Sequence, residues 1–258
     1  MQILTSQHLL LFGASLLAGT INSVAGGGTF ISFPALLFTG VNPIIANATN
    51  NTALWMGTIA SLGAYRSELA ERKHKLLILA SVSLFGGLLG SFLLLYTSSD
   101  FFSRLIPYLL LSATLLFTFS KHVTRMLKGR LPDWSDADIN APPAGVLLLQ
   151  FVIAIYGGFF GGGMGILMLA VLSVLGLGTI HTMNAFKCFL GICINGISII
   201  PFIISGMVAW HQALLMASGA ILGGYIGAVW AQKIDPMLVR RFVIFLGFAM
   251  SAYFFLKK

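Results

Sequence analysis

The chain has 258 residues, of which 57% are hydrophobic and only 9% are charged. A soluble domain carries about 25% charged residues, so this composition excludes a water-soluble globular protein and indicates a polytopic membrane protein. The net charge of +8 does not indicate a nucleic-acid partner, because the basic residues gather in short loops, where they set membrane topology.

The first apolar segment is expected over residues 7–25, with no lysine or arginine before it and no cleavage-site signature. We therefore interpret it as retained rather than as a signal peptide. It runs into INSVAGGGTF (21–30), where an asparagine, a serine and three glycines interrupt the apolar sequence. The next segment, 29–40, spans only about 18 Å as a helix, which is too short for a hydrocarbon core of about 30 Å. The first two segments are therefore predicted to form a broken or re-entrant helix pair.

The glycine corner between these segments is a candidate binding site. Irregular backbone within a membrane is tolerated where it is buried in protein or lines a wet cavity. A helix that begins at Thr29 directs free N–H groups and the positive end of its dipole toward that point, which favours an anion. The alternative is structural, because small residues also allow transmembrane helices to pack closely. The candidate residues are Asn22, Ser23, Gly26, Gly27, Gly28 and Thr29.

Three further apolar segments complete the first half of the chain: 44–65, 76–96 and 104–120. The first of these is unusually polar for a membrane crossing. Its Asn47, Asn50 and Asn51 share one helix face through their i, i+3, i+4 spacing. After the last segment, residues 121–143 contain charges and prolines, and we expect them to form a water-exposed linker.

The second half repeats this order with five apolar segments: 144–160, 165–177, 180–204, 212–232 and 241–256. When the two halves are aligned with each other, Gly26 falls on Gly161 and Asn47 falls on Asn184. Such matches keep their order at nearly constant spacing, which indicates an internal duplication. The second half contributes its own candidate site residues: Gly161, Gly162, Gly163, Asn184 and Lys187.

The distribution of basic residues predicts which loops lie on which side of the membrane. Loops 66–75 and 233–240 and the linker carry lysine and arginine, whereas loops 97–103 and 205–211 carry none. The positive-inside rule then places the three basic segments in the cytoplasm and both termini outside. With five segments in each half, the second half is inverted relative to the first, as in many secondary transporters. The predicted fold is an all-α membrane protein of two five-segment inverted-topology repeats with a cytoplasmic linker: 1–120, 121–143 and 144–258.

Lys187 is the most informative residue because it lies inside an apolar segment while every Asp and Glu lies in a loop or at a segment end. A lysine at the centre of a membrane helix costs about 2.5–3.5 kcal/mol on insertion scales, and a bound anion would offset that cost. The same helix face carries Asn184, Cys188, Gly191 and Asn195. Two alternatives are that Lys187 extends to the cytoplasmic water or that it bonds backbone carbonyls.

Several other kinds of site are not indicated. Cys188 and Cys193 lie five residues apart on one expected helix and so face different directions, which argues against a disulfide or a metal site. The sequence contains no P-loop and no HExxH motif, and no nucleophile with an adjacent base is apparent. We therefore expect neither an enzyme nor a cofactor.

The glycine corners and asparagine-rich helices resemble those of the TauE/SafE family of sulfite exporters. The matching stretches are AGTINSVAGGGTFISFPALL and NATNNTALW in the first half, and GGFFGGGMGILMLAVL and MNAFKCF in the second. The resemblance covers nearly the whole chain and implies a bacterial multi-pass inner-membrane protein. It also implies export of small sulfur oxyanions or organosulfonates, such as sulfite or sulfoacetate. The site positions that it implies are Asn22, Gly26–Gly28, Asn47, Asn50, Asn51, Gly161–Gly163, Asn184 and Lys187.

The predicted function is a secondary transporter of small anions that works by alternating access around a midplane site, with one repeat rocking against the other. Its predicted partners are a small anionic substrate and the lipid bilayer but not nucleic acid, and a homo-oligomer is compatible with the sequence. The alternatives are an anion channel on the same site and a membrane receptor or scaffold.

Overall fold

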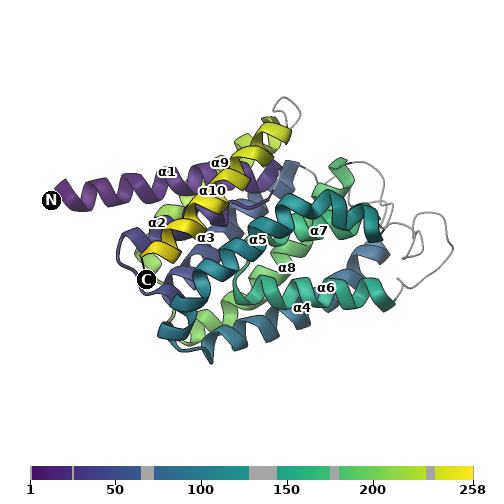
Figure 1. The fold of residues 1–258 in the computed structure, drawn as a ribbon, viewed down its shortest axis with the longest axis horizontal. Helices are drawn as coiled ribbons and strands as arrows, with labels where there is room; N and C mark the ends of the chain where they lie inside the picture. Colours follow the sequence, from purple (N-terminus) through teal and green to yellow (C-terminus); the bar gives the residue numbers. More distant parts are fainter. Residues whose placement is uncertain are drawn as a thin grey trace.

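The computed structural model describes residues 2–24, 26–64, 73–127, 144–174, 180–230 and 236–257. These residues form ten α-helices, and no strand occurs among them (Figure 1). The helices of the first half are α1 (Gln2–Val24), α2 (Thr29–Phe38), α3 (Pro43–Ala64), α4 (Lys73–Leu95) and α5 (Ser99–Leu127). Those of the second half are α6 (Ala144–Phe159), α7 (Met164–Val174), α8 (Ile180–Ile204), α9 (Trp210–Trp230) and α10 (Pro236–Leu256).

Each expected segment corresponds to one helix, and the all-helical class is confirmed. The largest difference is at α5, which continues to Leu127, so the first seven residues of the expected linker are helical. The rest of that linker, 128–143, lies outside the described residues, as do most of the basic loop 66–75 and the first part of the loop 233–240.

Hydrophobicity and length distinguish helices that can cross a membrane from helices that are too short to do so. Five stretches of the described chain are long and apolar enough to cross a membrane: Leu76–Leu95, Ser99–Phe119, Thr182–Ile204, Trp210–Val229 and Met237–Leu256. By contrast, α2 has 10 residues and α7 has 11, so each is only about 15–17 Å long. Helices of this length are too short to cross a bilayer.

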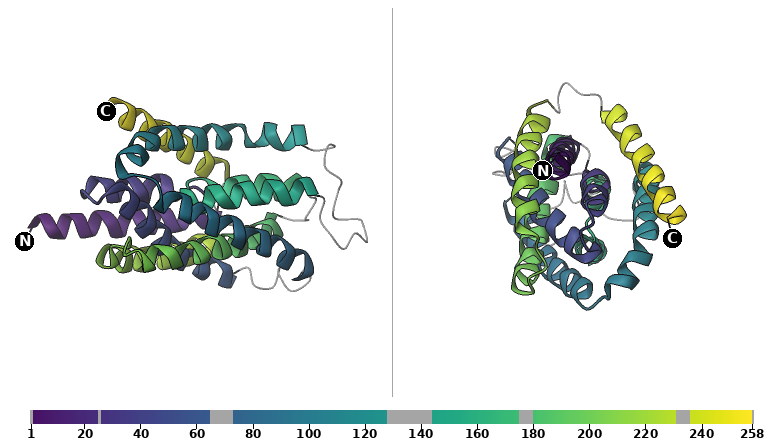
Figure 2. Two further views of the ribbon diagram at one scale, coloured as in Figure 1. Left: turned by 90° about the horizontal axis from the view of Figure 1, so that it is seen from below. Right: turned by 90° about the vertical axis from the view of Figure 1, so that its left-hand side faces the viewer.

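Both short helices turn back toward the end of the molecule from which the preceding helix came. Phe38, the last residue of α2, packs against Tyr253 and Phe254 near the end of α10, with ring centroids 5.4 and 6.4 Å apart. The N- and C-terminal ends of the chain lie at the same end of the helix bundle (Figure 2), so α2 returns to the end where α1 began. In the second half, α7 packs against α6, the helix that precedes it, as α2 packs against α1. The chain therefore reverses direction after α1 and after α6.

Helices pack in pairs that correspond between the two halves. Helix α1 packs on α9 as α6 packs on α4, and α3 packs on α9 as α8 packs on α4. The hydroxyl of Ser61 donates to the carbonyl of Gly224 at 3.2 Å, and that of Ser198 donates to the carbonyl of Gly87 at 2.9 Å. The alignment that places Asn47 on Asn184 also places Ser61 on Ser198 and Gly87 on Gly224. The packing thus joins α1, α3 and α9 in one group and α4, α6 and α8 in another, and each group contains helices from both halves.

Glycines allow the closest of these helix contacts. A Cβ atom added to Gly223 of α9 would collide with the carbonyl of Leu16 in α1, and one added to Gly90 of α4 would collide with the carbonyl of Ile155 in α6. Because the obstructing atoms are backbone, neither contact can be relieved by a side-chain rotation. The backbones therefore approach as small residues permit in membrane helices.

A valine at position 223 is expected to disrupt the α1–α9 contact. Overpacking a well-filled interior costs about 1–3 kcal/mol, so Gly223→Val should lower the melting temperature of the purified protein by about 5 °C or more. Gly13→Val is the matched control, because nothing lies within 4 Å of a Cβ at Gly13 in α1. Equal melting temperatures of the two variants would contradict this packing.

Candidate functional site

Two glycine corners end α1 and α6 in the same way. The amide of Gly26 donates to the carbonyl of Ile21 at 3.0 Å, and the amide of Gly161 donates to that of Tyr156 at 3.1 Å. Both are bonds to the fifth preceding residue, as in the π-turns that occur at helix C-termini. Gly26 has a φ of +80° and Gly161 a φ of +75°, a region that L residues rarely adopt. The reversal of the polypeptide at these points therefore favours glycine.

The two corners lie against each other although they are far apart in the sequence. A Cβ on Gly26 would lie 3.3 Å from the backbone nitrogen of Ile166, in the first turn of α7. A Cβ on Gly163 would lie 3.7 Å from the ring of Phe30, in the first turn of α2. The starts of the two half-helices are thus brought together in the interior.

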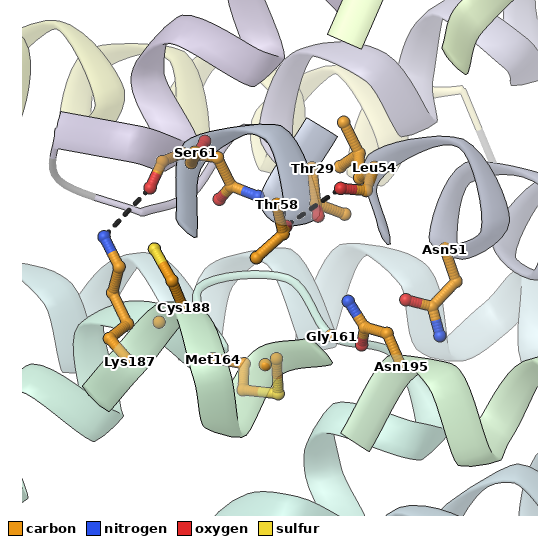
Figure 3. A pocket seen from close by; sticks show the side chains of 13 residues that line it. Thr29, Asn51, Leu54, Thr58, Ser61, Gly161, Met164, Lys187, Cys188 and Asn195 are labelled. Carbon is orange, nitrogen blue, oxygen red and sulfur yellow. Dashed lines mark hydrogen bonds between the residues drawn. The ribbon is translucent and has the colours of Figure 1, made fainter. Parts of the chain in front are cut away.

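A cavity lies beside these corners, between α3 and α8 (Figure 3). Its volume is about 40 Å³, enough for about three water molecules or one small oxyanion. Side chains of α3, including Asn51 and Thr58, face Cys188 and Asn195 of α8 across it. Thirteen described residues line it: Asn22, Thr29, Asn51, Leu54, Thr58, Ser61, Gly161, Met164, Gly165, Lys187, Cys188, Gly191 and Asn195.

The electrostatic character of the cavity comes from Lys187. It is the one charged side chain among the thirteen described lining residues, and it is only 5% exposed. The hydroxyl and amide groups around it are neutral, and they can donate hydrogen bonds. The part of the lining that the structure describes therefore has one formal positive charge and no negative one.

The ammonium of Lys187 also caps the C-terminal end of α1. Its Nζ donates to the carbonyls of Asn22 at 3.0 Å and Ser23 at 3.4 Å, and to Oδ1 of Asn184 at 3.0 Å. The last carbonyls of a helix lack partners within it and carry negative partial charge, so a cation is stabilised there. Of the three interpretations of Lys187, carbonyl bonding describes this structure and extension to water does not. Contact with an anion stays a prediction, and Lys187 is placed in the cavity wall where such contact is possible.

The polar face of α3 is divided between the cavity and the end of α6. Asn51 lines the cavity, whereas Nδ2 of Asn47 donates to the carbonyl of Phe159, the last residue of α6, at 2.9 Å. Asn50 is buried beside them. In the second half, Lys187 makes the comparable contact, since its ammonium donates both to the end of α1 and to Oδ1 of Asn184.

The structure separates the predicted site residues into those that line the cavity and those that shape it. Asn22, Thr29, Asn51, Gly161 and Lys187 line it. The others are not among the lining residues and belong to the two corners or to α1, α3 and α8: Ser23, Gly26, Gly27, Gly28, Asn47, Asn50, Gly162, Gly163 and Asn184.

Some of these supporting residues have identifiable partners. The amide of Gly28 donates to Oδ1 of Asn22 at 3.4 Å, and the carbonyl of Gly162 accepts from the hydroxyl of Tyr156 at 2.6 Å. The hydroxyl of Ser23 donates to the carbonyl of Thr20 at 2.8 Å. These bonds stabilise the conformation of the two glycine corners.

Residues in the C-terminal half of α3 were not predicted as part of the site. Leu54, Thr58 and Ser61 line the cavity together with Asn51, and their spacings of three, four and three residues place them on one helix face. In the alignment of the two halves Thr58 falls on Asn195, so the aligned helices α3 and α8 contribute corresponding lining positions. Extension of the Asn51 face by helical periodicity would have identified them.

Comparison with known proteins identifies relatives along nearly the whole chain. The profile of the sulfite exporter TauE/SafE family matches residues 11–254. A probable membrane transporter protein of Haemophilus influenzae is 30% identical over 94% of this chain and 92% of its own. A probable membrane transporter protein of a Sinorhizobium species is 29% identical over 95% of this chain and 91% of its own, and one of Bacillus subtilis is 26% identical over 93% and 95%. No solved structure matches the chain.

Proposed function

Because the chain belongs to the sulfite exporter TauE/SafE family, we propose that it exports small anions, foremost sulfite or small organosulfonates, by alternating access. Membership confirms the resemblance found in the motifs, and it makes the chain a multi-pass membrane transporter rather than an enzyme. The proposed location is the bacterial inner membrane, with both termini outside. The observation that carries the choice of an anion is the cavity beside the glycine corners, where the described lining has one ammonium and no carboxylate.

The positive charge of Lys187 favours an anion over a neutral or cationic solute. Two unit charges about 4 Å apart attract by about 4 kcal/mol at an effective dielectric constant of 20. The hydrogen bond from Nζ to the carbonyl of Ser23 is the longest of the three that the ammonium makes. An anion can therefore replace the Ser23 carbonyl as acceptor with the smallest loss of hydrogen-bond energy. In this account, the anion accepts from Lys187 and from neighbouring hydroxyl and amide groups.

Neutral groups on the opposite wall complement a small oxyanion. Asn51 carries an amide that can donate to anionic oxygens. The hydroxyls of Thr58 and Ser61 donate to backbone carbonyls in this structure, and each can donate to an anionic oxygen after it rotates. Oδ1 of Asn195 has no hydrogen-bond partner among the described residues, and it can accept from the hydroxyl of a protonated anion such as hydrogen sulfite. The combination of donors with one buried acceptor suits a small oxyanion that can carry a proton.

We infer that residues 1–120 and 144–258 are repeats of inverted topology, each with a re-entrant helix pair, joined by a cytoplasmic linker. The corresponding glycine corners, helix pairs and Ser61 and Ser198 bonds support a pseudo-twofold relation between the halves. Because the helices that pack together come from both halves, the moving bodies in this proposal are the groups α1–α3–α9 and α4–α6–α8 rather than whole repeats. Helices α3 and α8 meet between these groups, and the cavity lies at their contact.

Transport in liposomes tests the proposal. Liposomes containing the purified protein are expected to take up radiolabelled sulfite faster than empty liposomes, with saturation and with acceleration by unlabelled sulfite on the opposite side. Such counterflow requires alternating access, so flux without saturation or counterflow would instead identify a channel. Flux equal to that of empty liposomes for sulfite and for a panel of small sulfonates would contradict the proposed function.

A further inference from the structure

Two buried amide oxygens on one face of α3 have no hydrogen-bond partner among the residues that the structure describes. They are Oδ1 of Asn47 and Oδ1 of Asn50, in side chains that are 1% and 2% exposed. The residues are three positions apart, so their side chains are neighbours on the helix surface. Buried acceptors are almost always satisfied, and two adjacent exceptions call for a missing donor or cation.

The orientation of the Asn47 amide is fixed by its surroundings. Its Nδ2 donates to the carbonyl of Phe159 at 2.9 Å, and a reversed amide would place two oxygen acceptors against each other. Oδ1 of Asn47 must therefore remain the free acceptor. It lies beside the C-terminal end of α6, where the last carbonyls have no partners within the helix and carry negative partial charge.

The corresponding place in the second half already holds a cation. Asn47 corresponds to Asn184, and Asn50 corresponds to Lys187. In that half, the Lys187 ammonium donates to Oδ1 of Asn184 and to the carbonyl end of α1. The first half presents the same acceptors, an asparagine Oδ1 and the carbonyl end of α6, but neither α3 nor α6 contains a charged residue.

We propose that Oδ1 of Asn47, Oδ1 of Asn50 and the carbonyl end of α6 form a binding site for an alkali cation such as Na⁺. The bound cation occupies the place that the Lys187 ammonium fills in the second half. All its ligands are neutral oxygens, which suit a hard monovalent ion, whereas all-protein sites for divalent ions generally include carboxylates. Broken-helix ends near the centre of a membrane transporter are known positions for such ions.

This site goes beyond the proposed anion cavity and is adjacent to it. Asn51 follows Asn50 in α3, and Gly161 lies two residues after Phe159, and both Asn51 and Gly161 line the cavity. The cation and the anion would thus have separate ligands but neighbouring positions. Cation binding can be measured without any anion substrate, so its failure is distinguishable from failure of the proposed transport.

A sodium titration of the full-length protein tests the inference. The purified protein is held in detergent at constant ionic strength while choline chloride is replaced by NaCl, from about 1 to about 300 mM and without sulfite. Occupation of a millimolar site is expected to raise the melting temperature by about 5–10 °C. An unchanged melting temperature, or an equal rise in choline chloride when its concentration is increased alone, would overturn the proposal.

A lysine introduced at position 50 tests the location. Asn50→Lys supplies an ammonium in the place of the ion, as Lys187 does in the other half, and should reduce the sodium-dependent rise to below about 2 °C. Asn50→Ala removes one ligand and should weaken the apparent sodium affinity at least tenfold. This variant tests the same location if Asn50→Lys does not fold. Ser251→Ala is the matched control, because Oγ of Ser251 is also buried without a partner among the described residues but lies in α10, and it should retain the full response. A wild-type sodium response in a folded Asn50 variant would refute this assignment.

Discussion

Replacement of Lys187 by methionine is expected to lower the initial rate of sulfite transport in liposomes at least tenfold at substrate concentrations below saturation. Methionine retains most of the apolar stem but removes the only charge among the described residues of the cavity lining. A hydrogen bond to a charged group contributes about 1.5–3 kcal/mol, which corresponds to about a 10- to 150-fold loss of affinity. The loss should therefore appear first as a higher sulfite concentration for half-maximal rate.

Two further variants separate the role of this charge in binding from its role in folding. The ammonium also holds the end of α1, so the melting temperature of Lys187→Met must be measured together with transport. Lys187→Arg keeps the positive charge and its donors, and it should retain more transport than the methionine variant. Lys257→Met removes an exposed lysine that lies over the ring of Tyr253, and it should transport at the wild-type rate. Normal transport by a folded Lys187→Met protein would exclude Lys187 from the anion site.

Alanine at position 161 is expected to reduce transport at least tenfold because it affects both the backbone and the lining of the cavity. Gly161 has a φ of +75°, where a residue with a Cβ costs about 1–2 kcal/mol. The added atom would lie 3.2 Å from the carbonyl of Gly157 and 4.0 Å from Oδ1 of Asn51. The corner should relax away from this contact and displace the start of α7, so the effect on transport should exceed the effect on stability.

Gly40→Ala provides a control of equal backbone strain. Gly40 has a φ of +82°, and nothing lies within 4 Å of a Cβ built on it. Both variants should lower the melting temperature to a similar extent, whereas only Gly161→Ala should impair sulfite uptake in the liposome assay. Equal transport rates of the two variants would show that the corner does not shape the binding site.

The arrangement along the chain could be predicted because it depends on local features. Apolar length located each helix, and the short segments after Gly26–Gly28 and Gly161–Gly163 predicted the short helices α2 and α7. The requirement for glycine was also local, since the positive φ values of Gly26 and Gly161 follow from the reversal of the backbone. Hydrophobicity does not determine where a helix ends once the chain has left its apolar part. The apolar pattern therefore did not predict that α5 continues to Leu127.

Contacts between distant parts of the chain could not be predicted in the same way. The Asn22 carbonyl that accepts from Lys187 lies 165 positions away in the sequence, and nothing in the local pattern around Lys187 identifies it. The grouping of α9 with α1 and α3 depends on where Gly223 and Gly224 allow backbones to approach. Alignment of the two halves predicted that Asn50 and Lys187 correspond, but only the tertiary structure shows that one place has an ammonium and the other has oxygens without a partner among the described residues.

The location of a bound anion is the most direct test of the account. Selenite is a close analogue of sulfite, and selenium gives an anomalous X-ray signal that identifies its position in a crystal of the full-length protein. We predict a selenium peak in the cavity between α3 and α8, with an oxyanion oxygen within hydrogen-bond distance of Lys187 Nζ and neighbouring hydroxyls of Thr58 or Ser61. A selenium peak confined to another part of the protein, with the cavity filled only by water and the three hydrogen bonds of Lys187 unchanged, would contradict it.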